Sequence, residues 1–499
     1  MSFISINYLI FFPAVVLLYY VLPKRVRMYW LLIASYYFYM SWNAKYALLL
    51  FASTAVTYLC GLGIEAVRSS KQRDDKRILA GKRFILILSL VLNLGLLFYF
   101  KYIGFAAESL SEFFSKTGIA LNIPGTDILL PVGISFYIFQ AVGYTIDVYR
   151  GDVPAEKNPF RYALFVSFFP QLVAGPIERS KNLLAQLREE RDFDAENARA
   201  GLLTMSYGIF MKMVAADSIA AVIDPVFASP ASYSGMMILF AAILFSFRIY
   251  LDFNGYTLIA IGSAKVLGIR LTPNFDTPYM GLSVGDFWRR WHISLTSWFR
   301  DYLYIPLGGN RKGKVRKYIN TIIVFMLSGL WHGAAWHFVA WGLLNGLILI
   351  AEDLLKPLKR RIDLKLKIRT DDPFYKWIRR FVTFFIVTIT WIFFRAGSLP
   401  QAASLIGMIF KDFRPAWFIN FEFGKLFTDP QAMLGVLVPL LIVIIFDIFK
   451  ARGKEFTDLV FNRQAVLRWI IYICIALSII YWGFYGKGYE QTQFIYFQF

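Results

Sequence analysis

Hydrophobic runs separated by short polar and basic segments repeat along the whole chain of 499 residues. A run of about 20 apolar residues is long enough to cross the core of a bilayer as a helix. Residues 319–354 exceed the length of one span and are bounded by basic clusters, so they predict a hairpin of two helices. Single spans are predicted over residues 6–22, 28–42, 46–67, 84–105, 130–149, 202–227, 236–261, 381–394, 433–449 and 466–484. The predicted fold is therefore all-α and polytopic, with about twelve transmembrane helices.

Two segments depart from this pattern. Residues 165–176 are apolar but short and contain Pro170 and Pro176, which predicts a re-entrant segment that protein must shield from lipid. Residues 265–318 contain no full span and are rich in aromatic residues, arginine and proline, which is typical of helices half-embedded at a membrane surface. Re-entrant and interfacial helices are therefore expected between the spans.

The composition agrees with a membrane protein. Hydrophobic residues make up 58% of the chain and charged residues only 17%, which excludes a soluble protein because its surface could not be covered with polar groups. No long polar block interrupts the spans, so the sequence predicts a single membrane domain over residues 1–499.

The net charge of +20 is concentrated in short loops, as the positive-inside rule describes for cytoplasmic loops. Lys24, Arg25 and Arg27 directly follow the first predicted span, which places the N-terminus outside a multi-pass protein of the cell membrane. With about twelve crossings the C-terminus also lies outside. No nucleic-acid partner is expected. The basic loops could bind anionic lipid headgroups or a phosphorylated cofactor, and composition does not separate these two.

Two of the three histidines fall in the apolar stretch of residues 328–337. An ionisable side chain in lipid is costly, so each is either functional or held by a structural hydrogen bond. His332 lies about fourteen residues after the basic cluster, which is about two-thirds of a bilayer core, and imidazole can take a proton from a hydroxyl. Gly329 and Gly333 have the spacing that lets another helix approach closely. His337 projects elsewhere on the same helix.

A second cluster occupies Asp286-Phe287-Trp288-Arg289-Arg290-Trp291-His292. Its guanidinium groups between indole rings could contact phosphates or anchor an interfacial helix. No Walker, Rossmann or zinc-binding pattern accompanies it, and Cys60 and Cys474 lie far apart in apolar runs, so no metal site is predicted.

Further polar residues lie inside the predicted span over residues 236–261. Arg248 and Asp252 are four residues apart, and the spacing predicts a structural ion pair on one helix face. The segment 252–256, with Asn254 at its centre, also fits the lining of a cavity, and both interpretations stay open.

Several of these stretches together resemble the membrane-bound O-acyltransferase family, and within it the branch of alginate O-acetylation membrane proteins. The resemblance covers most of the chain. It rests on the motif of residues 286–295, on Arg300-Asp-Tyr-Leu-Tyr-Ile-Pro-Leu-Gly-Gly309, on Ser328-Gly-Leu-Trp-His332-Gly-Ala-Ala, on Pro131-Val-Gly-Ile-Ser-Phe136 and on Val173-Ala-Gly-Pro176-Ile-Glu178.

The resemblance implies a helical fold with the family histidine at His332 and a second position at His292. Residues 265–354 then form the core signature region. It implies no bound cofactor. The substrate that donates the acyl group would be a thioester, either acetyl-CoA or an acyl carrier, and it would enter from the cytoplasm of a bacterial cell. The acyl group would pass to a cell-surface polysaccharide through an extracytoplasmic partner of esterase fold. We expect Trp288, Arg289, Arg290 and Asn254 to hold the donor.

The tail of residues 485–499 is expected outside the membrane and ends on aromatic residues typical of an interfacial belt. It also resembles the aromatic C-terminal motif of cell-wall acylation systems, in which Tyr496 would be a transient acyl carrier. The chain departs from the motif of the branch at residues 253–258. It also carries Asn345 at a position where the branch often has histidine.

The sequence is compatible with two alternatives to polysaccharide O-acetylation. One is D-alanyl transfer from a carrier protein to teichoic acids, a sister activity that shares the resemblance. The other is a transporter or lipid flippase, suggested by the many crossings and by buried charges at Lys212, Asp217, Arg248 and Asp252.

Overall fold

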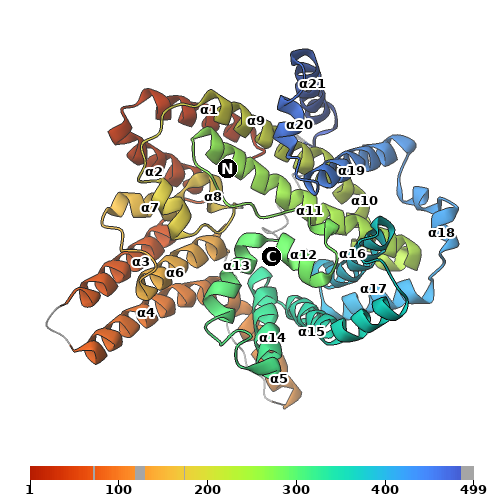
Figure 1. The fold of residues 1–499 in the computed structure, drawn as a ribbon, viewed down its shortest axis with the longest axis horizontal. Coiled ribbons are helices and arrows are strands. Elements are labelled where there is room, and N and C mark those ends of the chain that lie inside the picture. The colour runs from red at the N-terminus through yellow and green to blue at the C-terminus, as the bar shows by residue number, and fades with distance from the viewer. Residues whose placement is uncertain (71–73, 119–129, 174, 485–499) are drawn as a thin grey trace. The chain divides into compact units, whose positions relative to one another are not determined.

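The computed structural model describes residues 1–70, 74–118, 130–173 and 175–484, and the chain forms two compact units. Unit 1 contains Met1–Leu202 and Ile259–Thr272, and unit 2 contains Leu203–Leu258 and Pro273–Phe499. All regular elements among the described residues are helices (Figure 1), which confirms the predicted all-α class. The prediction of a single membrane domain stays a prediction.

Unit 1 is built around three helices, α3, α4 and α6, that pack against one another (Figure 1). Polar groups buried between these helices are paired: the Ser53 hydroxyl donates to Asn93 at 2.6 Å, and the Ser89 hydroxyl donates to Thr145 at 3.3 Å. Such hydrogen bonds join helices where apolar surface alone gives little driving force. The helices are α1 (Ile6–Val21), α2 (Lys24–Met40), α3 (Tyr46–Arg68), α4 (Asp75–Leu97), α5 (Ile103–Lys116), α6 (Ile134–Arg150), α7 (Pro159–Ser167) and α8 (Phe169–Leu172).

The short helices α7 and α8 cover most of the segment predicted as re-entrant. Phe168 between them and Phe169 at the start of α8 are fully buried, and the backbone N–H of Phe169 donates to the Ser35 hydroxyl at 3.1 Å. The carbonyl of Phe165 accepts from the Gln140 amide at 2.6 Å. Protein therefore shields this irregular backbone and satisfies its polar groups, as expected. Its depth in a membrane stays a prediction.

Unit 2 holds all three histidines. The π-helix η3 (Phe210–Ala216) joins α9 to α10 without a break, and α9 and α11 contribute residues to both units. The helices are α9 (Ala195–Ile209), α10 (Asp217–Ala228), α11 (Gly235–Val266), α12 (Val284–Arg290), α13 (Ile293–Phe299), α14 (Gly313–His332), α15 (Trp336–Lys365), α16 (Pro373–Arg395), α17 (Leu399–Lys411), α18 (Ala416–Ile419), α19 (Pro430–Lys450), α20 (Phe456–Phe461) and α21 (Ala465–Trp482).

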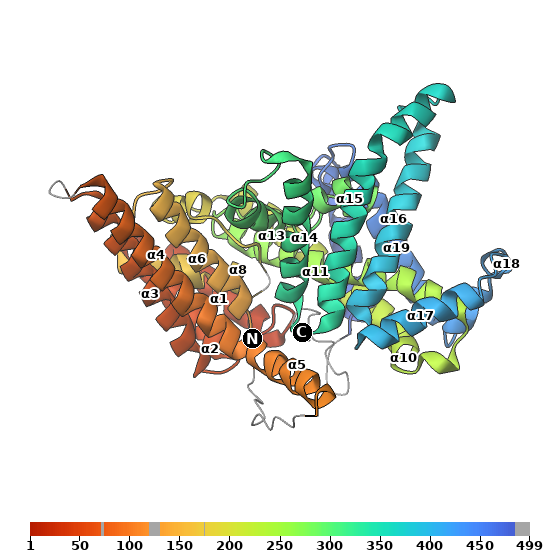
Figure 2. The ribbon, with the colours of Figure 1, turned by 90° about the horizontal axis from the view of Figure 1, so that it is seen from below.

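The predicted hairpin over residues 319–354 is confirmed as α14 and α15 (Figure 2). The two helices pack along each other, and α15 packs in turn against α16. A methyl group added at Gly329 would lie 2.2 Å from the carbonyl oxygen of Phe338, and one at Gly342 would lie 2.1 Å from that of Phe325. Both glycines therefore allow the helix backbones to approach at a distance that no other residue permits.

Seven helical segments among the described residues are long and apolar enough to cross a membrane, as judged by length and composition. They include 42 residues that run continuously through α4 and α5. The segments are Tyr46–Arg68, Asp75–Lys116, Gly235–Val266, Trp336–Lys365, Pro373–Arg395, Pro430–Lys450 and Ala465–Trp482. A polytopic membrane protein is thus confirmed, while the number of about twelve crossings stays a prediction because α2 and α6 have only 17 residues each.

Candidate active site

His332 is the last residue of α14, and its side chain is 3% exposed. Three aromatic rings surround the imidazole with centroids at 5.0 Å for Trp331, 5.2 Å for Trp341 and 5.4 Å for Phe394, each close to edge-on. Trp341 comes from α15 and Phe394 from α16, so three helices enclose the ring. These walls restrict the orientation of the imidazole and exclude bulk water from it.

His292 lies at the corner between α12 and α13, and its side chain is 1% exposed. Its φ of 44° is in the left-handed region, which histidine adopts more readily than most residues. Asn274 holds this corner: its carbonyl accepts from the Ile293 N–H at 2.9 Å, and its side-chain oxygen accepts from the Ser294 hydroxyl at 2.6 Å. The corner is therefore fixed in one conformation.

The two imidazole rings lie 6.3 Å apart between centroids, at an interplanar angle of 58°. The ring of Phe253 packs edge-on against His292 at 4.7 Å. Burial lowers the pKa of His292 to about 3, so this imidazole is neutral at ordinary pH. The fold thus brings together two residues 40 positions apart that the sequence placed in separate clusters.

Trp288, Arg289 and Arg290 sit in one turn of α12 but face different surroundings. The Trp288 indole is buried and meets the Trp341 ring edge-on at 5.6 Å, so it supports a wall of the His332 pocket. The Arg289 side chain is 73% exposed, with a long contact of 3.4 Å to Asp286. Arg290 is 30% exposed and contacts Asp286 at 3.2 Å. Only Trp288 therefore joins the histidine pocket, while the two arginines lie toward the surface.

Asn254 follows Phe253 on α11, but its amide points to a different polar group. It donates to the Tyr250 hydroxyl at 3.3 Å, and that hydroxyl donates to the carboxylate of Asp447 on α19 at 3.1 Å. The polar segment over residues 252–256 is thus engaged in contacts between helices. His337 is buried and its ring contacts Phe338 at 4.3 Å, consistent with a place outside the histidine pair.

The predicted ion pair between Arg248 and Asp252 is wrong. The Arg248 guanidinium pairs with Asp224 instead, and Arg395 reaches the same carboxylate at 2.8 Å. Asp252 pairs with Lys212 at 2.7 Å. Spacing within one helix could not reveal this, because both partners come from neighbouring helices.

Lys212 stands at the centre of a buried charge cluster that the sequence had shown only as separate residues. Its ammonium group lies 2.7 Å from Asp217 and 2.7 Å from Asp252, and the three side chains are between 1% and 4% exposed. Lys212 belongs to the π-helix η3, an element that often marks functional positions. Tyr496 of the predicted tail lies outside the described residues.

The fold therefore places a buried pair of imidazoles, which are suited to proton transfer, inside a polytopic membrane protein. Comparison with known proteins gives the reaction. The profile of the membrane-bound O-acyltransferase family matches residues 156–394, which contain both histidines. The chain belongs to this family, and it is an O-acyltransferase.

The curated relatives refine this picture. The chain is 39% identical over 402 residues to a probable alginate O-acetylase of Pseudomonas aeruginosa, covering 81% of this chain and 73% of the relative. It is 35% identical over 407 residues to the peptidoglycan O-acetyltransferase of Helicobacter pylori, covering 76% and 73%. It is 29% identical over 352 residues to a teichoic acid D-alanyltransferase of Streptococcus thermophilus, covering 66% and 77%.

Proposed function

We propose that this enzyme moves an acetyl group from a cytoplasmic thioester donor, acetyl-CoA, to a polysaccharide at the cell surface. The two relatives named as acetylating enzymes are more similar to the chain than the D-alanyltransferase is, which supports acetyl as the group transferred. The names of all three relatives concern polymers of the cell surface or the exterior, which supports a polysaccharide acceptor.

His332 is proposed as the general base. A ring nitrogen takes the proton of the acceptor hydroxyl while the hydroxyl oxygen attacks the carbonyl carbon of the thioester. The carbon–sulfur bond then breaks, and the proton passes from the imidazolium to the leaving thiolate. His292, which is neutral, can donate a hydrogen bond to the oxygen that becomes negative during the attack.

Arg289 and Arg290 are proposed to hold the phosphates of the donor. Their position toward the surface supports this role, because a guanidinium group that is accessible can form paired hydrogen bonds with phosphate oxygens. Trp288 connects this turn of α12 to the wall of the histidine pocket, so donor binding and catalysis would share one rigid element. Asn254 remains a candidate for donor contact.

The remaining assignments follow the family resemblance. The enzyme would lie in the cytoplasmic membrane of a bacterium with both termini outside, and an extracytoplasmic partner of esterase fold would pass the acetyl group on. The first acceptor would be the hydroxyl of Tyr496 or a serine of that partner. Either hydroxyl satisfies the chemistry proposed for His332.

The single observation that carries the proposal is the buried imidazole of His332 facing a second, neutral imidazole at 6.3 Å. The test is incubation of the purified protein with radiolabelled acetyl-CoA, followed by detection of label on the protein or on added polysaccharide. We expect wild-type protein to take up label and His332→Ala to lose it without loss of folding. His337→Ala is the matched control, because His337 lies outside the pair, and it should keep the label.

Acetylation at wild-type rate in His332→Ala would refute the role of this residue. Loss of retained label in Tyr496→Phe would place the intermediate on that tyrosine, and retained label there would assign it elsewhere. If acetyl-CoA is not used at all while a D-alanyl carrier protein is, the proposal is wrong and the activity is that of the teichoic acid relative.

A further inference from the structure

Unit 1 contains a cavity of about 150 Å³ that is separate from the residues of the histidine pair. Its walls come from the end of α1, the start of α2, from α7, from residues 186–191 and from Ile269. The volume is below the 300 to 1,000 Å³ that is usual for pockets enclosing a drug-sized ligand. The cavity therefore suits a small group, with the rest of its bearer outside.

Basic side chains outnumber acidic ones in the walls, and two of them are paired at the rim: Lys24 with Asp192 at 2.8 Å and Arg191 with Glu189 at 2.7 Å. Six cationic side chains line the cavity together with only two carboxylates, those of Glu189 and Glu190. The cations are Lys24, Arg25, Arg27, Arg161, Arg188 and Arg191. Five of the six are arginines, whose planar guanidinium groups match the geometry of phosphate oxygens.

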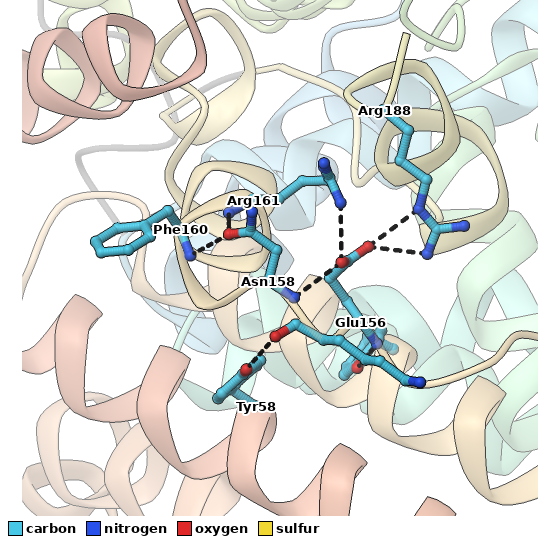
Figure 3. A network of polar contacts seen from close by, with 8 residues as sticks. Tyr58, Glu156, Asn158, Phe160, Arg161 and Arg188 are labelled. Atoms are coloured by element: carbon cyan, nitrogen blue, oxygen red, sulfur yellow. Dashed lines mark hydrogen bonds and ion pairs between the residues drawn. The ribbon is translucent and has the colours of Figure 1, made fainter. Parts of the chain in front are cut away.

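Two of these arginines are held in place by one buried carboxylate (Figure 3). Glu156, whose side chain is 4% exposed, accepts from Arg188 at 2.8 Å and 3.0 Å and from Arg161 at 3.1 Å. Burial acts to raise the pKa of Glu156, but the hydrogen bonds from the Asn158 N–H and from Arg188 and the charge of Arg161 hold it below its ordinary value. The carboxylate therefore stays ionised and fixes the two guanidinium groups beside the cavity.

Two other arginines keep their charge without a carboxylate. Arg27 donates to the backbone carbonyls of Leu22, Arg191 and Tyr20 at 2.6 to 3.1 Å, which orients its guanidinium group but leaves its positive charge uncompensated. Arg25 makes no hydrogen bond or ion pair with any residue that the structure describes. Arg27 fixes part of the wall, and Arg25 offers a charge that folding does not use.

Apolar side chains continue outward from this basic cavity. Met28, Leu31 and Leu164 form part of its lining. Beside the lining, Tyr29 follows Met28 on α2 and Phe160 precedes Arg161 on α7; these rings are 40% and 49% exposed, and their centroids lie 5.2 Å apart. A group with a phosphate at one end and hydrocarbon at the other would match both surfaces.

We propose that this cavity binds the phosphate group of an anionic phospholipid, whose acyl chains lie along the exposed apolar side chains of α2 and α7 beside it. Basic pockets beside membrane helices recognise such headgroups through charge and paired hydrogen bonds. The site lies outside the residues assigned to acyl transfer, and the lipid is a bound component there and not a substrate.

The test uses native mass spectrometry of the full-length protein in a neutral detergent, titrated with phosphatidylglycerol or phosphatidylcholine. The first lipid molecule to bind the wild-type protein should bind more tightly when it is phosphatidylglycerol than when it is phosphatidylcholine. Arg25→Gln should weaken this binding about fivefold, the loss expected for one basic side chain near an anionic surface. Arg25→Glu should weaken it further, and Arg25→Lys should stay near wild type.

Arg77→Gln is the matched control, because Arg77 is an exposed arginine of unit 1 that does not line the cavity. Equal affinity in Arg25→Gln, Arg77→Gln and wild type would overturn the proposal. Inorganic phosphate provides a second arm: displacement of phosphatidylglycerol by millimolar phosphate alone would show that a soluble phosphate is the ligand and would overturn the lipid as its source. Acetyl transfer is measured separately, so failure here leaves the test of His332 unaffected.

Discussion

The close packing of α14 on α15 makes Gly329→Ala an informative substitution. The added methyl group would lie 2.2 Å from the carbonyl oxygen of Phe338, whereas contacts of this kind below 3.0 Å essentially do not occur. The obstacle is backbone, so it cannot rotate away as a side chain would. The two helices must therefore separate by about 0.8 Å or tilt.

This displacement acts directly on the proposed catalytic residue. Gly329 lies one turn before His332 on α14, while the Trp341 ring that packs on His332 belongs to α15. A misplacement of about 1 Å in a catalytic group can lower the rate about 100-fold. We therefore expect Gly329→Ala to lose 10- to 100-fold in acetyl transfer, together with about 1 to 3 kcal/mol of stability from overpacking.

The assay combines the rate of acetyl transfer with thermal unfolding of the purified protein in detergent. Gly435→Ala on α19 is the matched control, because a methyl group there meets nothing within 4 Å. Alanine favours a helix over glycine by up to about 1 kcal/mol, so this control should be as stable as wild type or slightly more stable. A Gly329→Ala protein with wild-type rate and unfolding temperature would refute the reasoning.

The remaining predictions concern buried charges. Lys212→Met should lower the free energy of unfolding by about 3 to 5 kcal/mol, because it leaves Asp217 and Asp252 buried without their shared cation. Thermal unfolding measures this, and a triple variant with both aspartates changed to asparagine should recover much of the loss; unchanged stability in Lys212→Met would contradict the prediction. Glu156→Gln should cost about 2 kcal/mol at neutral pH, because Gln keeps the shape of the side chain but loses the charge that holds Arg188. The folded protein holds the pKa of Glu156 below its unfolded value of about 4.3. The loss of stability in Glu156→Gln should therefore be fully present above that pH and should disappear as the pH falls through the lower pKa of the folded state. A difference that grows on acidification would contradict it.

The sequence predicted those parts of the fold that depend on local pattern. The length of residues 319–354 and the basic clusters on either side were enough to predict the α14–α15 hairpin. The spacing of Gly329 predicted a close helix contact, and the structure places the backbone of α15 against it. These features follow from hydrophobic length and side-chain size, which are properties of each segment alone.

Partners in the tertiary structure could not be predicted in the same way. Spacing favoured Asp252 as the partner of Arg248. In the packed helices Asp252 instead forms an ion pair with Lys212, 40 positions earlier in the chain, and Arg248 pairs with Asp224. The 6.3 Å between His292 and His332 likewise depends on a left-handed corner held by Asn274, which no hydrophobic pattern encodes. The contact of the Asn254 amide with Tyr250 was likewise not predictable, and the role of Asn254 toward the donor stays a prediction.

The length of α15 has a practical consequence for imaging this protein. A helix of 30 residues is about 45 Å long, so it exceeds a bilayer core of about 30 Å by roughly 15 Å. Its basic last turns continue beyond the span and pack with the start of α16, so the pair forms an antiparallel arm that ends at residues 366–372 (Figure 2). Particles with little mass outside the detergent belt are difficult to align. A rigid helical module fused in phase across this turn would supply an alignment marker without touching the histidine pocket.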